Sequence, residues 1–344
     1  MRLDGGAIVL AGVALVGGTA LLLAYVWDGA GRLRRGAVVV ACVLALLVTA
    51  ALQLNRMTEM YPSWSALAGR RAELPEAPPA GDPAPVRSAA LPHGSAIQRL
   101  SIAGPASKLT LPVYVYLPAA YQQDPRVRFP VIEALHGYPG SPRTWINRLS
   151  IQSYLDTEIR AGRMAPTVVL LPYQTPRQLL DTECTDLAHG PKAETFLTAD
   201  VPAYARARFR VRTDRAGWGL IGYSAGGYCA INLALRHPEE YAAGASLSGY
   251  GEPGITVGDG SERTTNNDDW RLAHLPQPAV ALYVAWAADD AATMRESLRL
   301  AALAAPPLAV TTAVVAHGGH SAAAWKAMEA PAFDWLSAHL ARPQ

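Results

Sequence analysis

Two long stretches near the N-terminus carry no charged residue, and this feature limits what the first part of the chain can become. They run from Gly6 to Trp27 and from Gly36 to Leu54. A helix needs about 20 apolar residues to cross a bilayer, so each stretch is long enough to span one. A cleaved signal peptide is the alternative, but it would have a shorter apolar core and no second span behind it. The sequence therefore predicts a two-helix transmembrane hairpin over residues 1–55, with spans at about 6–27 and 36–54.

The positive charges indicate which way this hairpin faces. Its connector, DGAGRLRRG, holds Arg32, Arg34 and Arg35, whereas Arg56 after the second span is balanced by Glu59. Positive residues in short loops tend to stay on the cytoplasmic side. We therefore expect a multi-pass protein of the cell membrane, with the connector inside and everything after the second span outside.

The rest of the chain divides into a linker and a folded domain. Residues 56–96 are rich in proline and alanine and show no apolar period, as expected of an extended spacer. Residues 97–344 are long enough to bury one large core. The chain has a net charge of +2, from 30 Lys and Arg against 28 Asp and Glu, and the domain has no basic cluster. Nothing therefore predicts a nucleic acid as a partner, and no protein partner is evident.

Apolar strand-like runs alternate with helix-like segments along the predicted domain. Strands are expected at 109–118, 130–137, 166–173, 217–224, 243–250, 279–287 and 308–316, and helices at 145–162, 196–209, 226–236, 291–304 and 321–340. This alternation predicts an α/β fold, with a mostly parallel sheet and helices on both of its faces. Catalytic residues of such a sheet lie beyond the carboxyl ends of its strands.

The pentapeptide GYSAG, residues 222–226, follows one of these strands and opens a helix. A G-x-S-x-G sequence alone is weak evidence, but the strand-turn-helix context is what a nucleophile elbow requires. Glycine at 222 and 226 removes the Cβ atoms that would collide with neighbouring elements. We therefore predict that Ser224 is a nucleophile; the alternative is a glycine turn that only permits close packing.

A nucleophilic serine needs a base, and the base needs an acid, which follow in the order Ser, Asp or Glu, His. The loop HGGHSAAAW offers His317 and His320, and His320 is the predicted base because it lies past two glycines. The turn after strand 279–287 offers two acids: Asp290, further into the turn, is predicted, and Asp289 is the alternative. Weaker acid candidates precede that strand, namely Glu252, Asp259, Glu262, Asp268 and Asp269.

Two backbone N–H groups are expected to stabilise the oxyanion. One is that of Ala225, directly after the nucleophile, and the other is that of Tyr138 in the loop HGYPGS. His136 in this loop is expected to support it, because the chain order argues against a role as the base. No third ligand has a suitable spacing to the two downstream histidines, so no metal or cofactor is predicted.

The cysteines fit an oxidising compartment. Cys42 lies in the second apolar stretch, which leaves Cys184 and Cys229 in the predicted domain. Two cysteines outside the cytoplasm can form a disulfide. The alternative is a small buried residue at each position.

Taken together, these motifs resemble the α/β-hydrolase family that contains the esterase D-type enzymes and the antigen 85 mycolyltransferases. The resemblance covers about residues 97–340 and rests on VYVYLPAAY, LHGYPGSPRTW, DTECTDL, the run from ETFLTADVPAYARARF to GASLSGY, and GGHSAAAW. It implies the α/β-hydrolase fold, with Ser224 as nucleophile, His320 as base, and Tyr138 and Ala225 as oxyanion donors.

Two features depart from the antigen 85 pattern. The run HGYP stands where those transferases carry an Asp-Gly-Leu-Arg run that helps to hold trehalose. The predicted acid is an aspartate, as in the esterase branch, whereas those transferases use a glutamate. Both departures favour the esterase branch over trehalose mycolylation.

The sequence thus predicts a membrane-embedded serine esterase that acts on an acyl ester or lipid substrate through an acyl-enzyme. An acyltransferase of cell-envelope lipids is the alternative, because its triad would be the same and only the acceptor pocket would differ. A non-catalytic membrane-tethered binding module is a third hypothesis, and the complete set of Ser, Asp and His argues against it. The insert at 251–278 is expected to roof the pocket.

Overall fold

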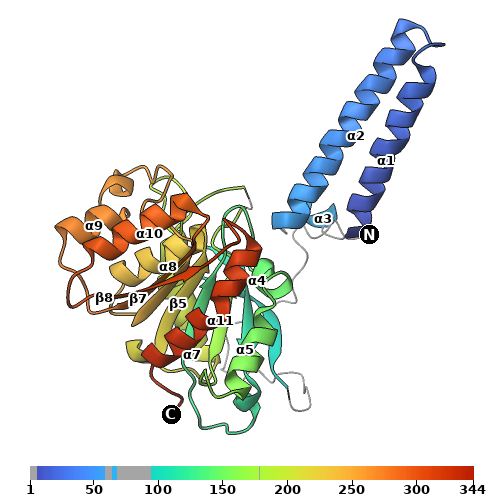
Figure 1. Cartoon of the computed structure of the whole chain (residues 1–344). Coiled ribbons are helices and arrows are strands. Elements are labelled where there is room, and N and C mark those ends of the chain that lie inside the picture. Colours follow the sequence, from blue (N-terminus) through green and yellow to red (C-terminus); the bar gives the residue numbers. More distant parts are fainter. Residues whose placement is uncertain (1–5, 59–63, 68–93, 178) are drawn as a thin grey trace. The chain divides into compact units, whose positions relative to one another are not determined.

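The computed structural model describes residues 6–58, 64–67, 94–177 and 179–344 (Figure 1). The chain divides into two compact units, Met1–Pro75 and Glu76–Gln344, and each is described by itself. Most of the predicted linker at 56–96 lies outside the described residues. The boundaries of the linker therefore stay a prediction.

Two long apolar helices make up most of the first unit. They are α1 (Gly6–Val26) and α2 (Arg32–Thr58), and the short helix α3 (Trp64–Leu67) follows. The two long helices pack closely, since a Cβ added at Gly12 would lie 2.7 Å from Thr49 Oγ1. Many large apolar side chains on them stay exposed, among them Leu10, Leu21, Leu33 and Leu47. Both helices are long and apolar enough to cross a membrane, a property that a signal sequence shares.

An eight-stranded sheet forms the centre of the second unit. In chain order its strands are β1 (Ala96–Ala103), β2 (Thr110–Leu117), β3 (Val131–Leu135), β4 (Val168–Pro172), β5 (Trp218–Tyr223), β6 (Ala243–Leu247), β7 (Ala281–Ala287) and β8 (Ala309–Val315). Their spatial order is β1-β2-β4-β3-β5-β6-β7-β8. β2 pairs antiparallel with β1 and β4, and all other neighbours pair parallel. The prediction of a mostly parallel sheet is confirmed.

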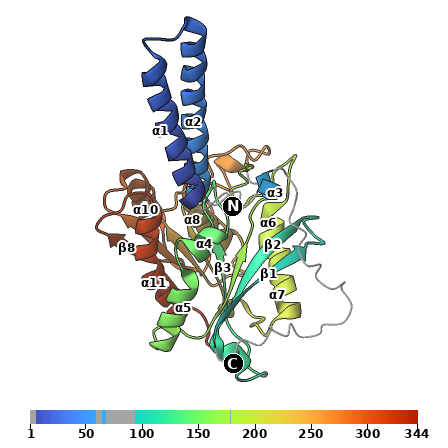
Figure 2. The same cartoon turned by 90° about the vertical axis from the view of Figure 1, so that its right-hand side faces the viewer.

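Helices cover both faces of this sheet, and each face has its own hydrophobic cluster. The first cluster joins the strands to α7 (Val201–Arg208), α8 (Ala225–Arg236), α9 (Asp268–His274) and α10 (Ala291–Leu303). The second joins them to α4 (Arg143–Asn147), α5 (Ile151–Arg160) and α11 (Ala322–His339). Figure 2 shows α5 and α11 on one side of the strands and α7 on the other. The shorter helical segments are η1 (Ala119–Gln122), α6 (Ala193–Thr195), η2 (Phe196–Asp200), η3 (Arg215–Gly217) and η4 (Ser261–Arg263).

Two expected elements differ from the sequence-based prediction. The single helix expected at 145–162 is wrong, because α4 ends at Asn147 and α5 begins at Ile151. Ser150 between them has a left-handed φ of +62°, which interrupts a right-handed helix. The strand β1 was not expected, because it carries Gln98 and Arg99 and packs at the edge of the sheet.

The helix expected at 196–209 begins earlier than its sequence signals indicate. Helical structure starts at Ala193 and passes through the π-helical turn η2 before α7. Asp200, the last residue of η2, accepts hydrogen bonds from the backbone N–H groups of Ala106 and Ser107 at 3.0 and 2.9 Å. Its carboxylate therefore ties the helix to the turn between β1 and β2.

Candidate active site

Ser224 lies in a sharp turn between β5 and α8. Its φ of +54° is in the left-handed region, which a serine rarely adopts. A Cβ added at Gly222 would lie 1.9 Å from the carbonyl oxygen of Gly226, and one added at Gly226 would lie 2.4 Å from that of Leu135. Both positions therefore require glycine, and the turn presents the serine at the carboxyl end of the sheet.

The loop after β8 brings a histidine to this serine. His320 Nε2 lies 2.8 Å from Ser224 Oγ, within hydrogen-bond distance. Gly318 and Gly319 precede the histidine with φ values of +131° and +54°, a conformation that favours glycine. The two glycines thus allow the chain to turn back over the sheet. His317 is exposed at the start of this loop.

An aromatic side chain borders the imidazole. The ring of Trp325, on α11, meets the ring of His320 edge to face at a centroid distance of 5.3 Å. The same indole stacks on Tyr223 at 4.5 Å, directly before the nucleophile. Trp325 therefore links the two sides of the site. The sequence analysis did not single it out, although it follows the histidine in the loop motif HSAAAW.

Asp290 holds the far side of the imidazole. Its Oδ2 lies 2.9 Å from His320 Nδ1, and its side chain caps α10 by accepting from the N–H of Thr293. Burial alone would raise the pKa of Asp290, but the hydrogen bonds from Thr293 and His320 outweigh it and place the pKa below its usual value. The carboxylate is thus ionised at neutral pH and can hold the Nδ1–H tautomer of the histidine.

Asp289 contacts the histidine loop through its backbone. Its carboxylate oxygens accept hydrogen bonds from the N–H groups of Gly318 at 3.1 Å and Gly319 at 2.8 Å. These two bonds lower the pKa of the exposed carboxyl group. The two neighbouring aspartates therefore differ in position: Asp290 meets the ring and Asp289 shapes the loop that carries it.

The weaker acid candidates lie elsewhere in the fold. Asp268 is buried and accepts a hydrogen bond from Asn232, and Asp269 forms an ion pair with Arg299. Both begin α9 within the insert. Neither carboxylate has a contact with His320 among the described residues.

The predicted oxyanion loop lies against Ser224. A Cβ added at Gly137 would lie 2.8 Å from Tyr223 Cε2 and 3.1 Å from Ser224 Cβ, so the backbone that leads into Tyr138 runs beside the serine. The N–H of Ala225 is the first of α8, where an α-helix leaves its amides without an intrahelical acceptor. The dipole of α8 adds a partial positive charge at the same point.

His136 forms hydrogen bonds that support this loop. Its N–H donates to Gln174 Oε1 at 2.6 Å, and its Nδ1 lies 2.9 Å from the carbonyl oxygen of Gly137. Burial lowers the pKa of His136 to about 4, so the imidazole is neutral at physiological pH. Gln174 was not expected from the sequence. It follows the carboxyl end of β4, where the placement rule for parallel sheets could have found it.

A disulfide lies next to the oxyanion loop. Cys184 and Cys229 have their Sγ atoms 2.05 Å apart and their Cα atoms 5.7 Å apart. Cys229 belongs to the first turns of α8, and Cys184 belongs to a segment between β4 and α6. The bridge therefore attaches this segment to the helix that begins directly after Ser224.

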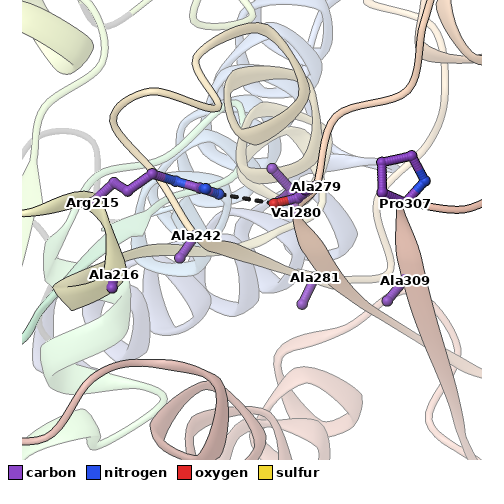
Figure 3. A pocket seen from close by; sticks show the side chains of 8 residues that line it. All are labelled: Arg215, Ala216, Ala242, Ala279, Val280, Ala281, Pro307 and Ala309. Atoms are coloured by element: carbon purple, nitrogen blue, oxygen red, sulfur yellow. Dashed lines mark hydrogen bonds between the residues drawn. The ribbon is translucent and has the colours of Figure 1, made fainter.

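A wider cavity lies at the opposite end of the sheet. It has a volume of about 310 Å³ and is lined by Arg215 and small side chains that precede or begin the strands β5 to β8 (Figure 3). The guanidinium group of Arg215 donates to the carbonyl oxygen of Ala279 at 2.9 Å. The amino ends of parallel strands face away from their carboxyl ends, so this cavity is separate from the site around Ser224. Within the described ranges, no three His, Cys, Asp or Glu side chains gather where they could hold a metal ion.

Comparisons with known proteins agree with this arrangement. The family model "Putative esterase" matches residues 106–335. A protein of Corynebacterium glutamicum named only as uncharacterized is 28% identical over 241 residues, which are 65% of this chain and 56% of the relative. The diacylglycerol acyltransferase/mycolyltransferase Ag85A of Mycobacterium ulcerans is 37% identical over 67 residues, 20% of this chain and 19% of the relative. The chain thus spans little more than half of the first relative and about a fifth of the second.

Solved structures share the fold. A ferulic acid esterase matches with a TM-score of 0.63 at 19% identity, over 72% of this chain and 99% of that one. An S-formylglutathione hydrolase of Agrobacterium tumefaciens matches with a TM-score of 0.60 at 15% identity, over 75% of this chain and 100% of that one. At these identities the likeness concerns the fold alone, and it confirms the predicted α/β-hydrolase architecture.

Proposed function

The chain belongs to the esterase family, and from this premise we propose that it is a serine esterase that works through an acyl-enzyme. The observation that carries the proposal is the chain of two hydrogen-bond contacts from Ser224 Oγ through His320 to Asp290, at 2.8 and 2.9 Å. These are the distances at which a base can take a proton from a hydroxyl group and be held in one tautomer.

The proposed reaction has two halves. The Nε2 atom of His320 takes the proton of Ser224 as Oγ attacks the ester carbonyl, and the N–H groups of Tyr138 and Ala225 stabilise the negative oxygen that forms. The histidine then gives the proton to the leaving alcohol, and the acyl group stays on the serine. Water then loses a proton to the same histidine as it attacks the acyl carbon. The bond to Ser224 Oγ breaks, the histidine returns the proton to Oγ, and the acid is released. Asp290 stays ionised throughout.

Transfer of the acyl group to an alcohol is the second candidate. Its support is the match to the mycobacterial diacylglycerol acyltransferase/mycolyltransferase proteins, which is confined to about a fifth of the chain. The chemistry of the first half-reaction is the same for both candidates. They differ in whether water or an alcohol attacks the acyl-enzyme, so product analysis with and without added alcohols separates them.

The N-terminal hairpin is proposed to hold the enzyme in a membrane with its second unit outside the cytoplasm. The support is the set of exposed apolar side chains on α1 and α2 and the arginines near the turn between them. The guanidinium group of Arg35 lies 5.8 Å from the centre of the Trp27 ring. Tryptophan is enriched at membrane interfaces, and positive residues in short loops are typical of the cytoplasmic side.

One experiment tests both parts of the proposal. A fluorophosphonate probe that cannot cross membranes is added to intact cells that produce the full chain, and labelling is compared with that of the Ser224→Ala variant. We expect labelling of the parent and none of the variant, together with a loss of ester hydrolysis of about 10⁴-fold or more. Labelling only after the cells are opened would overturn the orientation. No labelling of the folded chain in either state would overturn the esterase.

A further inference from the structure

A narrow cavity adjoins the oxyanion loop, and the proposed reaction leaves it without a role. Its walls include Tyr138 and Ala225, the two proposed oxyanion donors, together with His136, Glu183 and the bridged Cys229. The free volume inside it is about 10 Å³, roughly what a single water-sized group requires. The cavity therefore lies where it can receive a small substituent of a bound acyl group.

The order of the strands decides which part of an ester reaches this cavity. Ser224 follows β5. Asp290 and His320 follow β7 and β8, which lie on one side of β5 in the sheet, whereas most of the cavity wall comes from loops after β3 and β4 on the other side of β5. The leaving alcohol must lie beside His320, because this histidine gives it a proton. The acyl part then extends to the opposite side, toward the cavity.

Two residues that line the cavity each have one buried polar atom without a hydrogen-bond partner. Glu183 is only 5% exposed; its Oε1 accepts a hydrogen bond from Tyr250 at 2.6 Å, but its Oε2 has none. His136 is 3% exposed; its Nδ1 contacts the carbonyl oxygen of Gly137, but its Nε2 has none. An unpaired buried polar atom is destabilising, and a ligand group that pairs with it restores the missing hydrogen bond.

The protonation states of these groups define what would pair with them. Burial and the charge of Asp181 raise the pKa of Glu183 to about 9, so it is a neutral acid with an O–H to donate. The imidazole of His136 is neutral, and with its hydrogen on Nδ1 toward Gly137, Nε2 is left as an acceptor. One donor and one acceptor are the complement of a hydroxyl group, which accepts one hydrogen bond and donates another.

We infer that this cavity is an acyl-side subsite for one hydroxyl group, so that short hydroxyacyl esters acylate Ser224 faster than the corresponding unsubstituted esters. The inference rests on the proposed esterase function and names its substrate class. Glu183 is the specificity-determining residue, and the disulfide between Cys184 and Cys229 holds it beside the oxyanion loop.

The test compares matched esters on the purified full chain in detergent. The substrates are the p-nitrophenyl esters of butyrate, 2-hydroxybutyrate and 3-hydroxybutyrate, and kcat/KM is measured for each. We expect one hydroxy ester to exceed butyrate by about tenfold or more, because a site built to bind a hydroxyl group discriminates strongly against its absence. Equal values for all three esters would overturn the inference.

Variants of the glutamate assign the preference to the cavity. The preference is expressed as the ratio of kcat/KM for the better hydroxy ester to kcat/KM for butyrate. Glu183→Gln keeps a neutral donor and is expected to keep most of this ratio. Glu183→Met removes the donor and is expected to bring the ratio close to one. Fluorophosphonate labelling of each variant checks that the site around Ser224 is folded. A ratio that persists in Glu183→Met would overturn the role of this residue. If that variant does not fold, Tyr250→Phe, which loses the hydrogen bond to Glu183, is expected to reduce the ratio instead.

The pH dependence gives a readout that a merely structural role would not move. Titratable groups that face Glu183 are Asp181 on its own segment, Tyr250 after β6, Tyr228 on α8 and His136 after β3. The ratio of kcat/KM for the hydroxy ester to kcat/KM for butyrate should fall as Glu183 ionises near pH 9. This fall should be absent from Glu183→Gln. An identical pH profile in both proteins would contradict the proposal. Failure of the esterase itself is distinguishable, since it would abolish labelling and the hydrolysis of all three esters.

Discussion

Loss of the bridge between Cys184 and Cys229 is expected to lower the free energy of unfolding by about 2 to 4 kcal/mol. The two cysteines are 45 residues apart in the chain, and a crosslink over a loop of this length lowers the entropy of the unfolded chain by about 13 cal/mol/K. This corresponds to about 4 kcal/mol at 25 °C. Glu183 and Cys184 have left-handed φ values of +41° and +54°, and relaxation of this strained backbone after the bridge is lost would recover part of that energy.

The measurement is equilibrium unfolding in urea, followed by tryptophan fluorescence on the full chain in detergent micelles. The parent is compared with the double variant Cys184→Ala, Cys229→Ala, and with the parent unfolded and refolded in reductant. The reductant must be present in the unfolded state, because both sulfurs are buried in the folded one. Cys42→Ala serves as the control, since Cys42 is a free cysteine in α2 and its loss should leave the response to reductant unchanged.

Two outcomes would refute this reasoning. If the free energy of unfolding of the double variant lies within about 0.5 kcal/mol of that of the parent, the bridge does not lower the entropy of the unfolded chain as expected. A loss that appears in the double variant but not on reduction of the parent would assign the effect to packing of the removed sulfurs. Agreement between reduction and replacement is the expected result.

Two further predictions concern single carboxyl groups. Asp290→Asn should lower kcat by about 10³- to 10⁴-fold because the amide no longer fixes the Nδ1–H tautomer of His320. Asp289→Asn should lower kcat by less than about tenfold, since its amide oxygen still accepts a hydrogen bond from the glycine loop. Equal losses of kcat in steady-state kinetics would contradict the assignment. Glu329 is fully buried with both carboxyl oxygens unpaired, and burial raises its pKa to about 9. Its neutral form is favoured by folding, so its contribution to stability is complete below about pH 4.5 and is lost as the pH rises toward about 9. The free energy of unfolding is measured in urea for Glu329→Gln and for the parent. The value of the variant minus that of the parent should rise by about 1 kcal/mol per pH unit between about pH 6 and pH 8. A difference that does not change with pH would contradict the assigned burial.

The architecture of the second unit could be predicted because its strands are continuous apolar runs. β3 to β7 are buried along almost their whole length, so they lack polar alternation, and β4, β5 and β7 appear in the sequence as apolar runs. β1 lacks this signal because it is an edge strand with polar side chains. The break between α4 and α5 was missed because a serine in the left-handed region leaves no mark in an otherwise helical pattern.

The candidate site could be predicted where residue type and chain order restrict the chemistry. Ser224 and His320 follow from the elbow motif and from the last strand. The choice between Asp289 and Asp290 rested only on their place in a turn, because neighbouring residues have the same sequence context and differ only in where their side chains point. The partners of His136 and Glu183 could not be predicted, since they come from loops distant in the chain and depend on burial.

The position of Ser224 between two groups of strands has a consequence for how this enzyme can be modified. Loops after β3 and β4 form most of the cavity wall, whereas the proposed acid and base follow β7 and β8. A mutagenesis library confined to residues 174–183 can therefore search for new acyl groups while leaving proton transfer intact. Exchange of the segment after β4 with that of other esterases of this fold should likewise separate selectivity from turnover.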